Sequence, residues 1–115
     1  MNNMKVDYYS FGSISINGTS YNADLIVFPN KIETNWWRLQ GHLLQIADIR
    51  KIFDISPEVL IIGTGDYGYM KVSDDILEEL EKRNIKYFVE KSSKAIEIFN
   101  SCKEKNKVLA IHLTC

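Results

Sequence analysis

Residues 60–69 read LIIGTGDYGY, an apolar run that ends in Gly63, Gly65 and Gly68. No polar side chain interrupts the run from Val59, which predicts a β-strand covered on both faces. The glycines have the G-x-G-x-x-G spacing of a dinucleotide-binding loop. That loop binds pyrophosphate because a helix begins inside the glycine motif. Here YMKVSD separates the last glycine from the next helix. We therefore interpret the motif as a strand that ends in a tight turn, with a dinucleotide site as the alternative.

Downstream of this turn, strand and helix patterns alternate. Ser73 is the expected N-cap of a helix, and residues 85–90 (IKYFVE) predict a second central strand. Ser92 or Ser93 is the expected cap of another helix, and residues 107–115 (KVLAIHLTC) predict the last strand. Strands and helices that alternate in this way form right-handed parallel crossovers.

The upstream half predicts antiparallel strands instead. Residues 5–11 and the apolar residues 23–29 (ADLIVFP) read as strands, and Asn17-Gly18 is a strong hairpin signal. Residues 30–42 (NKIETNWWRLQGH) have no regular pattern. We predict one three-layer α/β domain over residues 1–115, with a mixed, partly parallel central sheet and an N-terminal antiparallel hairpin.

Composition and charge argue against two classes of partner, nucleic acids and membranes. The 115 residues carry a net charge of −1, and no basic run suited to phosphates occurs, so we expect no nucleic-acid partner. No apolar run approaches the ~20 residues of a membrane helix, so we expect no membrane partner. The N-terminus lacks the apolar core of a secretory signal, and Cys102 and Cys115 do not form a disulfide framework. We therefore expect a cytoplasmic protein with free thiols.

Residues suited to catalysis or metal binding are few. His42 and His112 are the only histidines, and neither His-x-x-His nor Cys-x-x-Cys occurs. We therefore predict no metal site and no cofactor. Asp48 is interpreted as the N-cap of a short helix that Pro57 ends. A catalytic Cys115 paired with His42 is an alternative, but no complete catalytic constellation is visible. We assign no catalytic residue, and the sequence favours a non-enzyme without deciding the matter.

Trp36-Trp37-Arg38 is the most unusual local feature. Adjacent side chains on an extended chain point in opposite directions, so we expect one tryptophan to be buried and the other to be partly exposed. The leading interpretation of Trp36 and Trp37 is core packing or a protein-interaction surface. The alternative is a ligand platform on which Arg38 binds an anionic group.

A second hypothesis places a small-molecule pocket at the carboxyl end of the glycine-rich strand. Arg38 would fix an anion there, and backbone N–H groups of the turn would hold an oxyanion. The candidate lining residues are Arg38, His42, Gly63, Thr64, Gly65 and Asp66.

Several segments occur together with familiar order and spacing: ADLIVFPNKI, WWRLQGH, ADIRKIF, PEVLIIGTGDYG, KAIEIFN and the terminal HLTC. From about Val6 onward, the chain resembles the small-domain family that includes the adipogenesis-associated protein and a mitochondrial respiratory complex I assembly factor. The resemblance implies a three-layer α/β fold and assembly or regulatory interactions, with no catalytic residues to carry over. It departs from the mitochondrial branch because no Arg-rich presequence is seen. We expect a non-enzymatic module that binds protein, with its own copy as one candidate partner.

Overall fold

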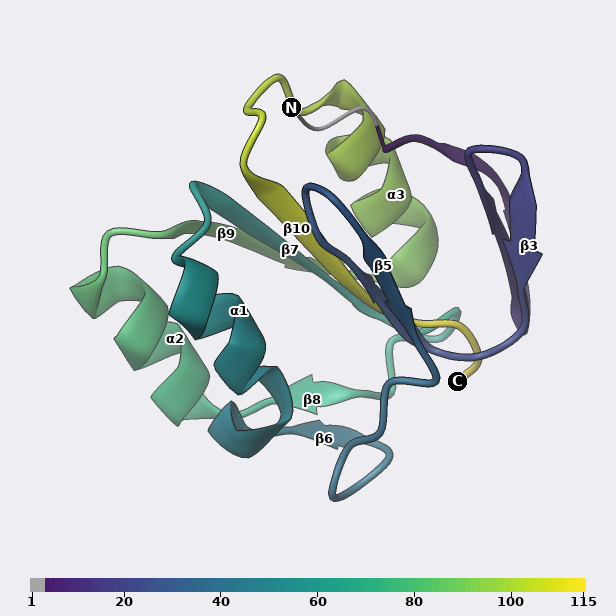
Figure 1. The fold of residues 1–115 in the computed structure, drawn as a ribbon. Helices are drawn as coiled ribbons and strands as arrows, with labels where there is room; N and C mark the ends of the chain where they lie inside the picture. The colour runs from purple at the N-terminus through teal and green to yellow at the C-terminus, as the bar shows by residue number, and fades with distance from the viewer. Residues whose placement is uncertain (1–3) are drawn as a thin grey trace.

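The computed structural model describes residues 4–115 as one mixed α/β domain (Figure 1). Its strands are β1 (Val6–Ser10), β2 (Ser13–Ile16), β3 (Thr19–Tyr21), β4 (Leu25–Val27), β5 (Ile32–Thr34), β6 (Leu43–Leu44), β7 (Val59–Thr64), β8 (Lys71–Val72), β9 (Lys86–Glu90) and β10 (Lys107–His112). Its helices are the 3-10 turn η1 (Ile46–Ile49), α1 (Arg50–Ile55), α2 (Asp74–Lys82) and α3 (Ser92–Ser101). No helix in this part of the chain is long and apolar enough to cross a membrane.

The central sheet has five strands in the order β5-β4-β10-β7-β9. β7 runs parallel to both β10 and β9, whereas β4 is antiparallel to β10 and β5. This confirms the predicted mixed, partly parallel sheet. Two details of the prediction are wrong: β9 is an edge strand rather than a central one, and the segment expected to be irregular contains β5. A three-residue strand is too short to show a period of two in sequence.

The two faces of the sheet are covered by different elements, as Figure 1 shows. Leu60 and Ile62 of β7 belong to the core beneath α1 and α2. Val59 and Ile61 belong to the core beneath α3 and the small β1-β2-β3 sheet. Successive side chains of a strand point to opposite faces, so a strand buried on both sides must be apolar at every position. The three layers follow directly from that pattern.

The N-terminal hairpin forms where its turn signal predicts. Ile16 pairs with Thr19 across Asn17-Gly18, and both turn residues have positive φ, 49° and 85°. Such a turn matches the right-handed twist of the flanking strands.

The N-cap residues observed in the structure agree only in part with those predicted from the sequence. Ser73 is the N-cap of α2, as predicted. Lys91 is the N-cap of α3, so neither Ser92 nor Ser93 has that role. Asp48 is not an N-cap either: its carboxylate completes a capping box at η1 by accepting a hydrogen bond from the N–H of Gln45. A polar residue near a helix start satisfies a free N–H from either end of the first turn, so composition alone does not place the boundary.

Candidate functional site

Strand register brings an acid and a histidine together at one end of the central sheet. Leu25, the first residue of β4, pairs with Ile111 of the antiparallel strand β10. Asp24 precedes Leu25 and His112 follows Ile111, so these two residues lie side by side. Asp24 Oδ2 is 2.7 Å from His112 Nδ1, and Asp24 Oδ1 accepts a hydrogen bond from the Leu113 N–H, also at 2.7 Å. These bonds join segments 88 residues apart in the chain. They fix the carboxylate in a single orientation.

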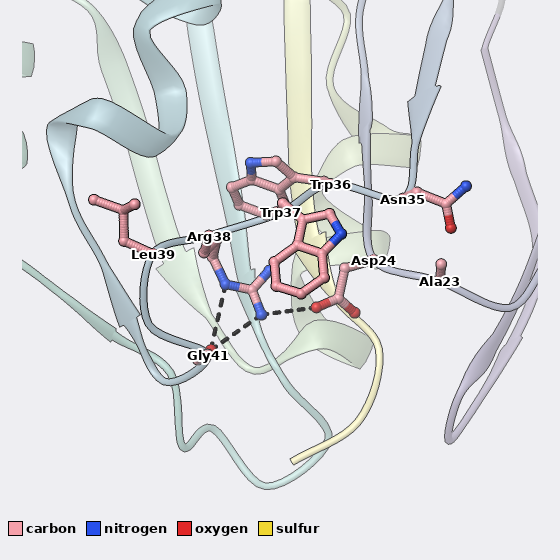
Figure 2. Close-up of a pocket in the computed structure, with 8 residues that line it drawn as sticks. All are labelled: Ala23, Asp24, Asn35, Trp36, Trp37, Arg38, Leu39 and Gly41. Atoms are coloured by element: carbon pink, nitrogen blue, oxygen red, sulfur yellow. Dashed lines mark hydrogen bonds and ion pairs between the residues drawn. The ribbon is translucent and has the colours of Figure 1, made fainter.

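Arg38 completes this cluster from the loop between β5 and β6. Its Nη2 donates to Asp24 Oδ2 at 2.8 Å, and its Nε and Nη2 both reach the carbonyl oxygen of Gly41, at 3.3 and 3.0 Å (Figure 2). The guanidinium also lies over the Trp36 ring, 4.9 Å from its centroid. Only 5% of the Arg38 side chain is exposed. A planar cation with this many fixed contacts holds its loop rigidly.

The ionisation of Asp24 sets the hydrogen-bond roles in the cluster. Burial alone would raise the pKa of this carboxyl, but hydrogen bonds from His112, the Leu113 N–H and Arg38 together outweigh it and hold the pKa below its ordinary value. An ionised carboxylate only accepts, so Nδ1 of His112 carries a hydrogen and donates to it. Arg38 Nη2 and His112 Nδ1, 3.2 Å apart, are then two donors that share one acceptor.

Two nitrogen atoms in the cluster stay unpaired. Arg38 Nη1 and His112 Nε2 are buried and have no hydrogen-bond partner among the described residues. His42 lies against the His112 ring, which it meets edge-on with centroids 5.7 Å apart. Buried polar nitrogen atoms without partners are rare in proteins, so both atoms mark a place where a ligand or a water can bind.

An exposed aromatic surface begins at His42. Its ring is 6.1 Å from Tyr69, Tyr69 is 5.9 Å from Tyr67, and Tyr67 is 6.1 Å from Phe11. Tyr67 and Tyr69 are each 57% exposed. Aromatic side chains of this kind are enriched in protein interfaces.

The two tryptophans have opposite environments, which confirms that one is buried and one exposed. Trp36 is 8% exposed, belongs to the core beneath α1, and donates from Nε1 to the carbonyl oxygen of Asp48 at 3.0 Å. Trp37 is 88% exposed and Leu39 is 76% exposed. The loop is pinned on both sides of Trp37, since the Trp36 N–H donates to the Asp24 carbonyl oxygen and the Leu39 N–H to the Asp48 carboxylate. The exposed indole therefore projects from an anchored backbone.

Two surface hollows flank Trp37. The first, of about 330 Å³, is bounded by Asp24, Arg38 and Leu39 and is drawn in Figure 2. The second, of about 470 Å³, lies towards η1 and α1. Asn35, Trp36 and Trp37 line both hollows.

The glycine turn is filled by the protein itself. A Cβ on Gly63 would lie 2.9 Å from both Ile111 Cγ1 and Ser92 Oγ, and one on Gly65 would collide with the carbonyl carbon of Cys115. The Gly65 N–H donates to Ser92 Oγ at 2.9 Å, and the Asp66 N–H donates to the carbonyl oxygen of Thr114. These N–H groups are therefore already paired, and the close packing explains why glycine is needed here.

The other predicted pocket residues divide into two groups. Thr64 is buried and donates from Oγ1 to the carbonyl oxygen of Glu90, and the Asp66 carboxylate accepts from Tyr9. Arg38 and His42 instead lie in the His112 cluster. Among residues 4–115, no three His, Cys, Asp or Glu side chains are grouped so that they could hold a metal ion.

Sequence reasoning missed Asp24 as a site residue and assigned no role to His112. The available signal was a titratable residue at one end of each of two mostly apolar strands, Asp24 before β4 and His112 at the end of β10. Asp24 and His112 meet only because their two strands are neighbours in the sheet, and the order of strands could not be deduced from the sequence.

Comparisons with known proteins agree with this architecture. The family model described as a protein of unknown function (DUF498/DUF598) matches residues 6–113. Among solved structures, the conserved hypothetical protein PH1505 from Pyrococcus horikoshii OT3 has a TM-score of 0.83 at 23% identity, covering 97% of this chain and 100% of its own. A Bartonella henselae protein described as an outer membrane protein also has a TM-score of 0.83, at 19% identity, covering 99% and 98%. No curated protein matched significantly. Likenesses at these identities establish the fold alone.

Proposed function

The chain belongs to the DUF498/DUF598 family of proteins of unknown function, and from its structure we propose that it is a cytoplasmic, non-enzymatic module that binds another protein chain through the loop around Trp37. The observation that carries this proposal is the contrast between an indole that is 88% exposed and an anchored loop beneath it. Residues that dominate binding at protein interfaces are typically Trp, Tyr and Arg. Trp37 would be the central contact of the interface.

Preorganisation supports this role for the loop. The bonds from the Trp36 N–H to the Asp24 carbonyl oxygen and from the Leu39 N–H to the Asp48 carboxylate tie the backbone down on either side of Trp37, so little conformational entropy is lost when a partner covers the indole. An exposed tryptophan on an anchored loop adds contact area at low entropic cost. Leu39 and the Tyr67–Tyr69 pair add exposed apolar and aromatic area.

Site-specific crosslinking in the host cell tests the proposal. p-Benzoylphenylalanine at position 37 should capture a defined protein on irradiation, and the same group at the exposed Tyr8 position should not. Asp24→Asn, which loosens the anchor of Arg38 without touching Trp37, should reduce the captured amount. Identical products from both positions, or no product from position 37, would refute an interaction through this loop.

A small anionic ligand is the second candidate function. The unpaired Arg38 Nη1 favours it, because it is a charged donor in the cluster that borders the 330 Å³ hollow. The neighbouring Asp24 carboxylate disfavours it, because it already neutralises the guanidinium. Native mass spectrometry of protein purified from its host tests this candidate: a retained adduct that Arg38→Met abolishes supports it, and bare protein contradicts it.

A further inference from the structure

The surface around Trp37 contains both a projecting side chain and hollows that could receive one. We propose that the partner of this surface is a second copy of the chain, in a two-fold symmetric dimer in which Trp37 of each copy enters the larger hollow of the other. This inference rests on the proposed function and specifies the partner of the same site. In a two-fold dimer, one patch on both copies makes the interface, so a projection and its receptor must lie on the same face.

The geometry of the loop meets this requirement. The 470 Å³ hollow shares Asn35, Trp36 and Trp37 with the smaller one, so the exposed indole stands at its rim. Ile26 and Ile49 also line this hollow. A hollow of a few hundred Å³ that is lined by both apolar and charged side chains suits tryptophan, whose ring is apolar and whose N–H is polar. A projection and a receptor this close together allow two identical contacts to form at once.

The charges around the larger hollow suit a copy of the same surface. Glu33 and Asp48 lie on its border together with Arg50 and Lys51. Lys51 Nζ is 3.1 Å from Glu33 Oε2, and 67% of the Lys51 side chain is exposed. The border therefore has two groups of each sign and no net charge. A surface of one sign would repel its own copy, whereas the balanced charges of this border do not.

The neighbouring strand adds a second reason for self-association. β5, which supplies Glu33 and leads directly into the loop, is the outermost strand on its side of the central sheet. An edge strand presents unpaired backbone groups, and one way that proteins protect such an edge is to cover it. A second copy seated over Trp37 would cover the edge in both molecules.

Sedimentation equilibrium from micromolar to millimolar protein is the first test. We expect a monomer–dimer equilibrium that Trp37→Ala weakens by at least about 30-fold, the effect of losing a dominant interface tryptophan. Trp37 is exposed, so this variant should fold, which circular dichroism checks. Tyr8→Ala is the matched control, since it removes another exposed aromatic from a different layer and should leave the dimer unchanged. A monomer throughout the range, or a dimer that Trp37→Ala does not weaken, overturns the inference.

Crosslinking between labelled and unlabelled copies is the second test. A ¹⁵N-labelled chain with p-benzoylphenylalanine at position 37 is mixed with unlabelled protein, and the joined peptides are identified by mass. The expected product joins position 37 of one copy to residues 49–51 of the other. Products elsewhere on the second copy contradict the arrangement.

The two proposals fail in different ways. A monomer whose position 37 still captures a different protein in the host overturns the dimer and leaves the proposed function standing. A dimer that is indifferent to Trp37, together with no capture from position 37, refutes both.

Discussion

Replacing Asp24 with Asn tests whether the buried cluster holds the loop in place. The asparagine keeps the shape of the side chain and removes its charge, so the Arg38 guanidinium, 5% exposed, loses its counter-ion. Removing one member of a buried ion pair typically costs about 3–5 kcal/mol. The amide oxygen of asparagine can still accept one hydrogen bond, so we expect the lower value, about 3 kcal/mol. Since globular domains are stable by only about 5–15 kcal/mol, this loss is large.

The loss can be converted into measured quantities. An entropy of unfolding of about 2.1 cal/mol/K per residue gives about 0.24 kcal/mol/K for 115 residues. A loss of about 3 kcal/mol then lowers Tm by about 12 °C. With an m-value of about 1–3 kcal/mol/M, the urea midpoint falls by about 1–3 M. Urea unfolding followed by circular dichroism measures this. Asp54→Asn, an exposed carboxylate on α1, is the matched control and should change stability by less than about 0.5 kcal/mol.

The pH dependence gives an independent check. The pKa of Asp24 is lowered in the folded protein, so its contribution is present above the unfolded pKa of about 3.9 and is lost as pH falls through the folded value. The difference between wild type and Asp24→Asn should be constant from pH 7 to about pH 5 and shrink below about pH 4. The double variant Asp24→Asn/Arg38→Met should be more stable than Asp24→Asn, because no uncompensated charge remains buried. A pH-independent difference, or full stability in Asp24→Asn, would refute the role assigned to the cluster.

Three further substitutions test the neighbouring structure. Ser92→Ala removes the hydroxyl that accepts from the Gly65 N–H and donates to the His112 carbonyl oxygen, so it should cost about 1–3 kcal/mol in urea unfolding, while Ser93→Ala in the same turn should be near neutral. Gly65→Ala places a Cβ against covering backbone at φ 111° and should cost more than about 2 kcal/mol, whereas Gly18→Ala, at φ 85° with open space around it, should cost about 1 kcal/mol. Equal losses in either pair would contradict these assignments. Burial, and then the charge and hydrogen bond of Asp66, raise the pKa of Tyr9 to about 12, so Tyr9→Phe should remove the ultraviolet titration component near pH 12, and wild-type stability should fall as pH rises from about 10 through 12.

The layered fold was largely predictable because the composition of a buried strand indicates whether one or both of its faces are covered. A strand such as β7, apolar at every position, has to lie between two layers, and Asn17-Gly18 specifies its own hairpin. Short elements were not predictable. β5 has three residues, and its strand conformation depends on pairing with β4 rather than on any pattern of its own. The cap at Gln45 was missed because several polar residues near that helix start compete for the same free N–H groups. The cap at Lys91 was missed because the Ser92 hydroxyl is used elsewhere, by the Gly65 N–H and the His112 carbonyl oxygen.

Features of the candidate site were predictable from the sequence only where the residues concerned lie in one short segment. Trp36 and Trp37 are adjacent, so the alternation of an extended chain predicted opposite environments for them, as the structure confirms. The contacts among Asp24, Arg38 and His112 could not be predicted, because they join three segments through the order of strands in the sheet. The predicted pocket residues Gly63 and Gly65 were identified by spacing alone, and spacing does not show that Ser92 and Cys115 fill the surrounding space.

The position of β10 has a consequence for how the protein matures during synthesis. Although β10 lies late in the chain, it is inserted between β4 and β7 in the middle of the sheet, and its last residue, His112, contacts Asp24. Contacts between such distant parts of a chain form late, because the intervening segment must first be closed into a loop. The full anchor of Arg38 therefore cannot assemble while residues 107–112 are still inside the ribosome. Trp37 would be presented in its final form only after residues 107–112 have joined the sheet, which would keep nascent chains from engaging a partner prematurely.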